Sequence, residues 1–442
     1  MWPRLVCVES LTPKGRRDFL KNWLKYGALT KYRQGVTPLV YVIVGNGPAG
    51  TNAIEQIRNI DPTGKIILIA QEANLPYSRI TTPEYMTNEL EEQDIYIRSA
   101  DFYENYAVET RLGHRVEQVL AQENLVILED GEKISYDKLL LATGSRPFIP
   151  SWIDLEVEGV FSLWNKADSE EINSFLPQVK NAVIIGGGLV GLQAARALNT
   201  YGIKVSVMEM ANRLMPGQLD QAAADMLLKA LANHGVQVCL ETEVKSLQVK
   251  DNKVEGVQTV DQLLEAELVI IAVGVRPNLE FLTESEVQIE KGIVVNEFMQ
   301  SSVPTIYAAG DIAQATSLLT GESMLRALWL TAVQQGKIAG ASMAGSRTAY
   351  PGSHAMNSIQ LFGLPIISLG RIEGGPGVEE VILRQPASGV YQKLLLEDGR
   401  LTGLLFAGEV QEAGVLYHKL GQQLNQGYWG SLRLLDVEDM LA

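Results

Sequence analysis

The chain has 442 residues, of which 46% are hydrophobic and 20% charged, proportions close to those of an ordinary globular protein of about three domains. It carries 37 Lys and Arg against 52 Asp and Glu, and the net charge of −15 argues against a nucleic-acid-binding protein. No stretch reaches the roughly 18 consecutive apolar residues of a membrane-spanning helix, so we expect no membrane span.

The chain opens with a basic arm over residues 1–38. Residues 1–40 contain eight Lys or Arg and two acidic residues, a charge of +6 in a protein that is otherwise acidic. Residues 15–21 look like a twin-arginine export signature, but cations interrupt the apolar run that should follow, so we expect a cytoplasmic protein. The same residues fit an amphipathic helix with Pro13 in its first turn, which either packs on its own body or docks a partner subunit.

Sulfur and imidazole groups are sparse. The two cysteines, Cys7 and Cys239, show no Cys-x-x-Cys spacing and no neighbouring histidine cluster, so we expect no metal site and no disulfide framework. Cys239 lies in an apolar run over residues 236–240 that predicts a buried strand, and we interpret it as a structural thiol.

One pattern occurs twice in the chain. An apolar strand over residues 40–44 leads into a glycine-rich turn, a helix that includes residues 52–57, and a second strand over residues 65–70. The second copy has a strand over 182–185, a glycine-rich turn, a helix over 192–200 and a strand over 205–209. The turns are Gly45-Asn46-Gly47-Pro48-Ala49-Gly50 and Gly186-Gly187-Gly188-Leu189-Val190-Gly191.

Each turn suits a diphosphate for a physical reason. The first glycine makes the tight turn, the second lets the backbone approach a pyrophosphate, and the third permits close packing of helix on strand. The helix amino terminus then faces the phosphate charge. The sequence therefore predicts an α/β protein with two Rossmann-like dinucleotide-binding domains.

The residue that ends the second strand of each copy should meet a ribose. In the second copy this residue is Glu209, whose carboxylate suits the free hydroxyls of NAD(H) and repels a 2′-phosphate, so NADH is favoured over NADPH. In the first copy Glu72 is our preferred ribose contact, although Gln71 also fits the position.

With these motifs, residues 39–425 resemble the pyridine nucleotide–disulphide oxidoreductases, and specifically the cysteine-free branch of rubredoxin and ferredoxin reductases and the nitrite reductase flavin domain. Further motifs that carry the resemblance are Leu75–Arg79, Leu141–Pro147, Ala272–Asn278 and Tyr307–Asp311. The resemblance implies an FAD domain over 39–150 and 275–345, an inserted NAD domain over 151–274, and a small C-terminal α+β interface domain over 346–442.

The resemblance also assigns residues to cofactors. Asp311 would hold the ribityl chain of FAD, and a helix containing Trp329 and Ala332 would aim its positive end at the flavin pyrimidine. The full FAD set is Gly45, Gly47, Pro48, Ala49, Gly50, Glu72, Arg79, Val116, Ala142, Thr143, Gly144, Gly310, Asp311, Trp329 and Ala332. The NAD set is Gly186, Gly188, Leu189, Gly191, Glu209, Val273 and Gly274.

The chain departs from its family at three places. Residues 79–86 contain no cysteine, which disfavours disulfide and peroxidatic cysteine chemistry. Glu84 stands where several relatives place a lysine near the flavin, and Gln193 stands where they place an acid. Both exchanges bear on the flavin potential and on the choice of electron acceptor.

The C-terminal region should form a small αβ unit. Residues 356–371 read as strands around a Phe-Gly-Leu-Pro turn, and residues 381–383 as another strand. Residues 391–406 predict a hairpin that turns at Asp398-Gly399, and residues 412–424 predict a helix.

The function implied is transfer of a hydride from NADH to flavin, which needs alignment rather than a protein acid or base, so we assign no catalytic side chain. Single electrons would then pass to an external iron–sulfur carrier, a ferredoxin, a rubredoxin or a partner subunit, with flow possible in either direction. An oligomer or heteromeric complex is expected. The alternatives are an NADH oxidase or nitrite-reductase-type component, and a non-catalytic NADH-sensing flavoprotein.

Overall fold

The computed structural model describes residues 37–318, 321–384 and 386–424. The basic arm, with its expected helix and export-like motif, lies outside these ranges apart from residues 37 and 38. Within the described ranges, no helix is both long enough and apolar enough to cross a membrane.

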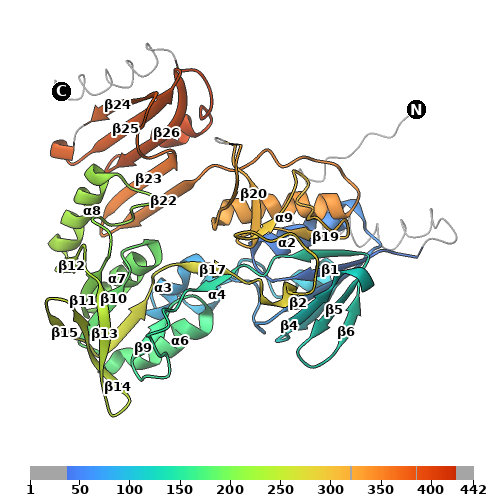
Figure 1. Cartoon of the computed structure of the whole chain (residues 1–442), viewed down its shortest axis with the longest axis horizontal. Helices are drawn as coiled ribbons and strands as arrows, with labels where there is room; N and C mark the ends of the chain where they lie inside the picture. The colour runs from blue at the N-terminus through green and yellow to red at the C-terminus, as the bar shows by residue number, and fades with distance from the viewer. Residues whose placement is uncertain (1–36, 319–320, 385, 425–442) are drawn as a thin grey trace. The chain divides into compact units, whose positions relative to one another are not determined.

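The first sheet contains five parallel strands in the order β19-β7-β1-β2-β3 (Figure 1). The central strand has a continuous apolar sequence because its side chains are buried on both faces. The strands are β1 (Val40–Val44), β2 (Lys65–Ala70), β3 (Val108–Leu112), β7 (Lys138–Leu141) and β19 (Ile306–Ala308).

We call the first sheet and the elements that pack on it the first unit. Two helices of this unit, α2 (Pro48–Ile60) and α9 (Trp329–Met343), pack directly on each other. Glycine makes the contact possible. A Cβ on Gly336 would lie 2.2 Å from the carbonyl oxygen of Ala49, and one on Gly340 would lie 2.5 Å from that of Ala53. The two helices therefore approach backbone to backbone.

Smaller elements accompany the first sheet along the sequence. Two three-stranded sheets have the orders β4-β5-β6 and β18-β20-β21. Their strands are β4 (Val116–Leu120), β5 (Leu125–Leu128), β6 (Lys133–Ser135), β18 (Ile293–Val294), β20 (Ala313–Thr316) and β21 (Ser323–Leu325). The short helices are η3 (Arg79–Thr81), α3 (Thr82–Met86), α4 (Glu92–Ile95), α5 (Phe102–Asn105), η4 (Ala121–Glu123) and η6 (Glu280–Leu282).

The second sheet also has five parallel strands, in the order β12-β11-β10-β16-β9. We call this sheet and the elements that pack on it the second unit. They are β9 (Val160–Ser162), β10 (Asn181–Ile185), β11 (Lys204–Met208), β12 (Gln237–Cys239) and β16 (Leu268–Ile271). The helices are α6 (Lys166–Phe175), η5 (Leu176–Gln178), α7 (Leu189–Tyr201) and α8 (Gln221–Asn233), and an antiparallel sheet is formed by β13 (Val244–Lys250), β14 (Lys253–Thr259) and β15 (Leu263–Glu265).

Cys239 ends β12, as predicted, but its residue is only partly buried. The expectation of a buried strand was wrong here, because β12 is the last strand at one edge of the sheet and only one neighbour covers it.

The chain passes between the two parallel sheets along one pair of short antiparallel strands. These are β8 (Ser145–Pro147) and β17 (Val275–Pro277), in which Arg146 faces Arg276. The outward and return crossings are therefore side by side.

The C-terminal unit is a five-stranded antiparallel sheet in the order β22-β23-β26-β25-β24. Its elements are β22 (Met356–Leu361), β23 (Leu364–Gly370), β24 (Val378–Arg384), η7 (Pro386–Ser388), β25 (Tyr391–Glu397), β26 (Arg400–Ala407) and α10 (Ala413–Tyr417). The predicted hairpin is confirmed, and its turn residues Asp398 and Gly399 both have positive φ.

The predicted helix over 412–424 was too long, since α10 ends at Tyr417. Beyond it the chain reverses through Gly421, at φ +78°, and Gln423 bridges back to Arg400 at the start of β26. Pairing with the start of β26 takes the place of the last helical turns.

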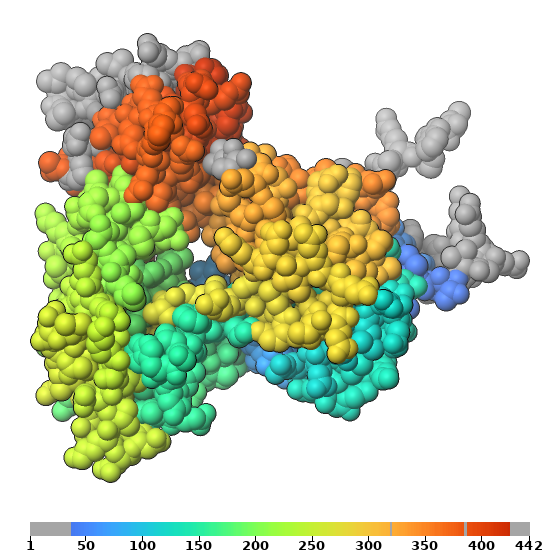
Figure 2. Space-filling view, in the orientation of Figure 1, coloured from blue at the N-terminus to red at the C-terminus, as the bar shows by residue number. Residues whose placement is uncertain are grey.

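The C-terminal sheet contacts helix α8 of the second unit (Figure 2). A buried polar group fixes this contact. The Lys393 ammonium lies 2.5 Å from the Asp220 carboxylate, and the Tyr391 hydroxyl donates a hydrogen bond of 2.7 Å to the same oxygen. Asp220 in turn caps α8 by accepting from the backbone N–H of Ala223.

Candidate dinucleotide-binding sites

The first glycine turn has the geometry that a diphosphate requires. Gly45 has φ +118°, and a Cβ there would lie 2.1 Å from the carbonyl oxygen of Ala142. A Cβ on Gly50 would lie 2.0 Å from the carbonyl oxygen of Gly45. Gly47 differs from both, because no atom lies within 4 Å of its Cβ position. It is the N-cap of α2, which begins at Pro48, so open space adjoins a helix amino terminus.

The second turn repeats this geometry. Gly186 has φ +115°, and its Cβ would lie 2.3 Å from the carbonyl oxygen of Ala272. A Cβ on Gly191 would lie 2.1 Å from the carbonyl oxygen of Gly186, whereas the Cβ position of Gly188 meets nothing within 4 Å. Gly188 is the N-cap of α7, which begins at Leu189. Both turns therefore fit a diphosphate by the same local shape.

Glu209 follows β11 directly and is held by the second turn. Its carboxylate accepts hydrogen bonds of 2.7 Å from the backbone N–H groups of Gly187 and Ala211. Because these bonds fix its position, the negative charge stays beside the second glycine turn.

Val273 and Gly274 lie on the loop after β16, next to the second turn. The backbone nitrogen of Val273 would be 3.2 Å from a Cβ on Gly186. The Val273 residue is 38% exposed, and Gly274, at φ +117°, has open space at its Cβ position. The structure thus brings both residues to the edge of the second turn.

In the first unit, Glu72 pairs with Arg79. Its carboxylate accepts hydrogen bonds of 2.5 Å from Arg79 Nη2 and from the Tyr77 hydroxyl, while Gln71 is exposed. Arg79 also lies over the Trp164 ring, 5.4 Å from its centroid. Burial raises the pKa of Asp311, and the charge of Arg79 opposes part of that rise.

Asp311 is the polar centre of the crossover region. Its carboxylate accepts a 2.6 Å hydrogen bond from the Ser145 hydroxyl, and burial raises its pKa above the usual range. The preceding Gly310 has φ +82° and donates its N–H to Gln335 Oε1 at 2.8 Å. A Cβ on Gly310 would lie 3.6 Å from the Cβ of Ala332, so Gly310 meets the first turns of α9, which begins at Trp329.

Thr143 and Gly144 are tied to the return crossing through Asn278. The Thr143 hydroxyl donates to the Asn278 carbonyl at 3.2 Å, and Asn278 Nδ2 donates to the Thr143 carbonyl at 3.0 Å. The backbone N–H of Asn278 donates to the Gly144 carbonyl at 3.0 Å. These bonds join the crossover strands immediately beside Asp311.

Three residues of the predicted FAD set lie close together near the amino termini of α2 and α9. A Cβ on Gly310, which follows β19, would lie 3.4 Å from the Cβ of Ala49 on α2 and 3.6 Å from the Cβ of Ala332 on α9. Asn46, in the glycine turn, keeps a buried Oδ1 without a hydrogen-bond partner among the described residues. Val116 is different, because it begins β4 and is 6% exposed within the hydrophobic core.

The sequence placed Ser145 and Asn278 in the crossover motifs and Gln335 in the helix with Trp329 and Ala332, but it gave none of the three a supporting role. Each residue lies inside a recognised motif or within one helical turn of a predicted site residue, so the sequence predicted the region but not the bond. The pairing of each with a partner more than 20 residues away could be seen only in three dimensions.

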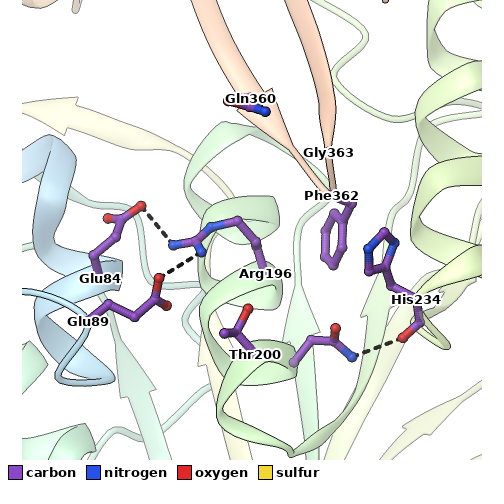
Figure 3. Close-up of a pocket in the computed structure, with 9 residues that line it drawn as sticks. Glu84, Glu89, Arg196, Thr200, His234, Gln360, Phe362 and Gly363 are labelled. Carbon is purple, nitrogen blue, oxygen red and sulfur yellow. Dashed lines mark hydrogen bonds and ion pairs between the residues drawn. The ribbon is translucent and has the colours of Figure 1, made fainter.

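A separate groove of about 450 Å³ lies where α3, α7, α8 and the β22–β23 turn meet (Figure 3). Glu84 and Arg196 form an ion pair on one side of it, and His234 stacks near Phe362 on the other. Glu84 is thus engaged with Arg196. Among the residues described, no cluster of three or more His, Cys, Asp or Glu side chains could hold a metal ion.

Comparison with known proteins agrees with this geometry. Residues 40–336 match the pyridine nucleotide-disulphide oxidoreductase model, and residues 356–423 match the rubredoxin NAD+ reductase C-terminal domain. The chain is 32% identical over 379 residues to the NADH-dependent phenylglyoxylate dehydrogenase subunit epsilon of Aromatoleum evansii, covering 85% of this chain and 90% of that protein.

A second relative is longer than this chain. Nitrite reductase [NAD(P)H] of Bacillus subtilis is 32% identical over 386 residues, which are 86% of this chain but only 47% of the relative, so the chain spans about half its length. Among solved structures, the covalent putidaredoxin reductase–putidaredoxin complex shares the fold, with a TM-score of 0.81, 24% identity, and coverage of 87% of this chain and 94% of that one. The chain therefore belongs to the pyridine nucleotide-disulphide oxidoreductase family and is an FAD-containing, NAD(H)-dependent member of it.

Proposed function

We propose that this protein takes a hydride from NADH bound at the second glycine turn and passes electrons one at a time to a separate iron–sulfur protein or subunit. The observation that carries the proposal is the pair of matched glycine turns on two parallel sheets, in a chain with no cysteine over residues 79–86. In this proposal the two dinucleotides exchange the hydride directly, because residues 79–86 offer no cysteine to carry the electrons between them.

The first unit would hold FAD through the residues gathered above. The open backbone at Gly47 and the amino terminus of α2 would bind its diphosphate, and Asp311 would bind its ribityl chain. Bound flavin supplies the chemistry, because it accepts a hydride from nicotinamide and releases electrons singly. The amino terminus of α9 would favour the negative charge that this transfer produces.

The second unit would hold NADH with its diphosphate at Gly188 and its adenosine ribose at Glu209. Replacing Glu209 with Gln keeps the side-chain size and removes the charge. We expect the preference for NADH over NADPH, measured as the ratio of kcat/KM values, to fall about tenfold, because repulsion of the 2′-phosphate is lost. An unchanged ratio would mean that the carboxylate does not face the ribose. Glu243→Gln, a change on an exposed ion pair with Lys245, is the matched control.

The acceptor is proposed from the relatives. The phenylglyoxylate dehydrogenase relative is named as a subunit, and the structural relative is a reductase caught with its redox partner. Both favour a protein acceptor in a complex, and electrons could flow in either direction. The basic arm is a proposed attachment for that partner, since it contrasts with an acidic body.

Anaerobic stopped-flow mixing with NADH tests the proposal. The flavin absorbance should bleach within a second, and a ferredoxin or rubredoxin added in a second mixing step should restore it. Flavin that stays oxidised would contradict NADH oxidation altogether. Reoxidation by air but by neither iron–sulfur protein would point instead to an NADH oxidase.

A further inference from the structure

In the sequence, helix α3 lies between β2 and β3 of the first parallel sheet, yet it packs into the second unit. Met86, its last residue, has no exposed surface and lies in the same hydrophobic core as Leu192 and Ala195 of α7. Ser169 on α6 donates a 3.2 Å hydrogen bond to the carbonyl oxygen of Thr82, and Asn173 donates one of 2.7 Å to that of Met86. Helix α3 is therefore anchored at both ends by the second unit.

The segment that precedes α3 contains a residue predicted to bind FAD. Helix α3 continues directly from η3, which begins at Arg79, the cation that pairs with Glu72 and influences Asp311. A displacement of α3 would therefore be transmitted to Arg79 over only a few residues.

Arg196 joins α3 to the helix of the second glycine turn. It lies on α7, two turns after Leu189, and its guanidinium spans two carboxylates, with Nη2 at 2.8 Å from Glu84 and Nη1 at 3.0 Å from Glu89. Figure 3 shows the guanidinium facing both carboxylates, with a dashed line to each. The three side chains are 21%, 25% and 31% exposed, so these charges are only partly screened by water.

The arrangement leaves little tolerance for loss of the arginine. One arginine pairs with two carboxylates, so the group carries a net charge of about −1, and Glu84 Oε2 is buried without a hydrogen-bond partner among the described residues. Without the guanidinium, the carboxylates of Glu84 and Glu89 would repel each other and would favour movement toward water. That movement would separate α3 from α7.

We propose that Arg196 is a positioning residue for hydride transfer. By holding α7 against α3, it sets the second glycine turn at a fixed distance and angle from the first cofactor site. Its ion pairs are with Glu84 and Glu89, which lie outside both glycine turns. The inference rests on the proposed hydride transfer from NADH.

The test compares Arg196→Gln, Arg196→Lys and a matched control, Arg111→Gln. Arg111 also spans two carboxylates, those of Glu109 and Glu132, but it lies wholly within the first unit. We expect Arg196→Gln to slow flavin reduction at saturating NADH by roughly tenfold to a hundredfold, because a small misalignment is costly in this step. The lysine variant should recover part of the rate, and Arg111→Gln should keep the wild-type rate.

Two further readouts separate misalignment from damage. The NADH dissociation constant and flavin reduction by dithionite should remain as in the wild type, whereas amide hydrogen exchange over residues 82–89 should accelerate. A wild-type reduction rate in Arg196→Gln, or a change confined to the dissociation constant, would overturn the inference. If wild-type flavin were not reduced by NADH, the proposed function would fail first, which is a different result.

If the Arg196→Gln variant does not accumulate as a flavoprotein, the Glu84→Gln variant tests the positioning role in its place. It removes one ion pair without leaving an unpaired charge. Slower reduction with an unchanged NADH dissociation constant supports the positioning role, and a wild-type rate overturns it.

Discussion

Replacing Gly191 with valine should abolish flavin reduction by NADH while FAD stays bound. A Cβ at this position would lie 2.1 Å from the carbonyl oxygen of Gly186 and 3.2 Å from Cγ2 of Ile184, so α7 must move away from β10. The helix amino terminus would then leave the diphosphate that it should bind. We expect at least a roughly hundredfold loss in the rate of flavin reduction, measured by stopped-flow absorbance.

Gly188→Ala is the control for this experiment. No atom lies within 4 Å of its Cβ position, so the free energy of unfolding should be unchanged. Its methyl group would occupy the space meant for the diphosphate, and the KM for NADH should rise about tenfold. Normal NADH kinetics in both variants would contradict the assignment of this turn, as would loss of FAD from both.

Replacing Lys393 with methionine should give the largest loss of stability. The Lys393 side chain is 3% exposed, and its removal would leave the carboxylate of Asp220 without its cation in a buried site. We expect the free energy of unfolding to fall by about 3–5 kcal/mol, measured by urea denaturation. The Tyr391 hydroxyl cannot compensate, because burial and Asp220 raise its pKa and keep it neutral.

An exposed ion pair supplies the comparison. Lys245 pairs with Glu243, and both side chains are about half exposed, so Lys245→Met should cost less than about 1 kcal/mol. Equal effects of the two substitutions would show that the C-terminal sheet is not held on α8 by the buried pair.

Local geometry explains which features the sequence could predict. The two glycine turns were predicted because Gly45, Gly50, Gly186 and Gly191 meet backbone within a few residues or at the adjacent strand, so spacing alone encodes their role. The hairpin at Asp398-Gly399 was predicted for the same reason. The α/β class was predicted from the apolar runs that parallel strands need.

Features that depend on distant segments could not be predicted. The hydrogen bond from Ser145 to Asp311 joins residues 166 positions apart, and no local pattern marks it. Met86 was expected with the first unit because of its place in the chain, yet it completes the core of the second. The helix expected over 412–424 satisfied a helical period, but pairing of Gln423 with the sheet shortened it.

The paired strands β8 and β17 suggest how such proteins could diversify. Since the backbone N–H of Phe148 donates to the carbonyl of Gly274 at 2.9 Å, the segment between them leaves and rejoins the rest of the chain at one point. A module whose two ends meet can be inserted into a host, exchanged for another or duplicated without rerouting the host polypeptide. Exchange of this segment by recombination at β8 and β17 would change the nucleotide preference in one step, provided that the new segment also leaves space in its core for Met86.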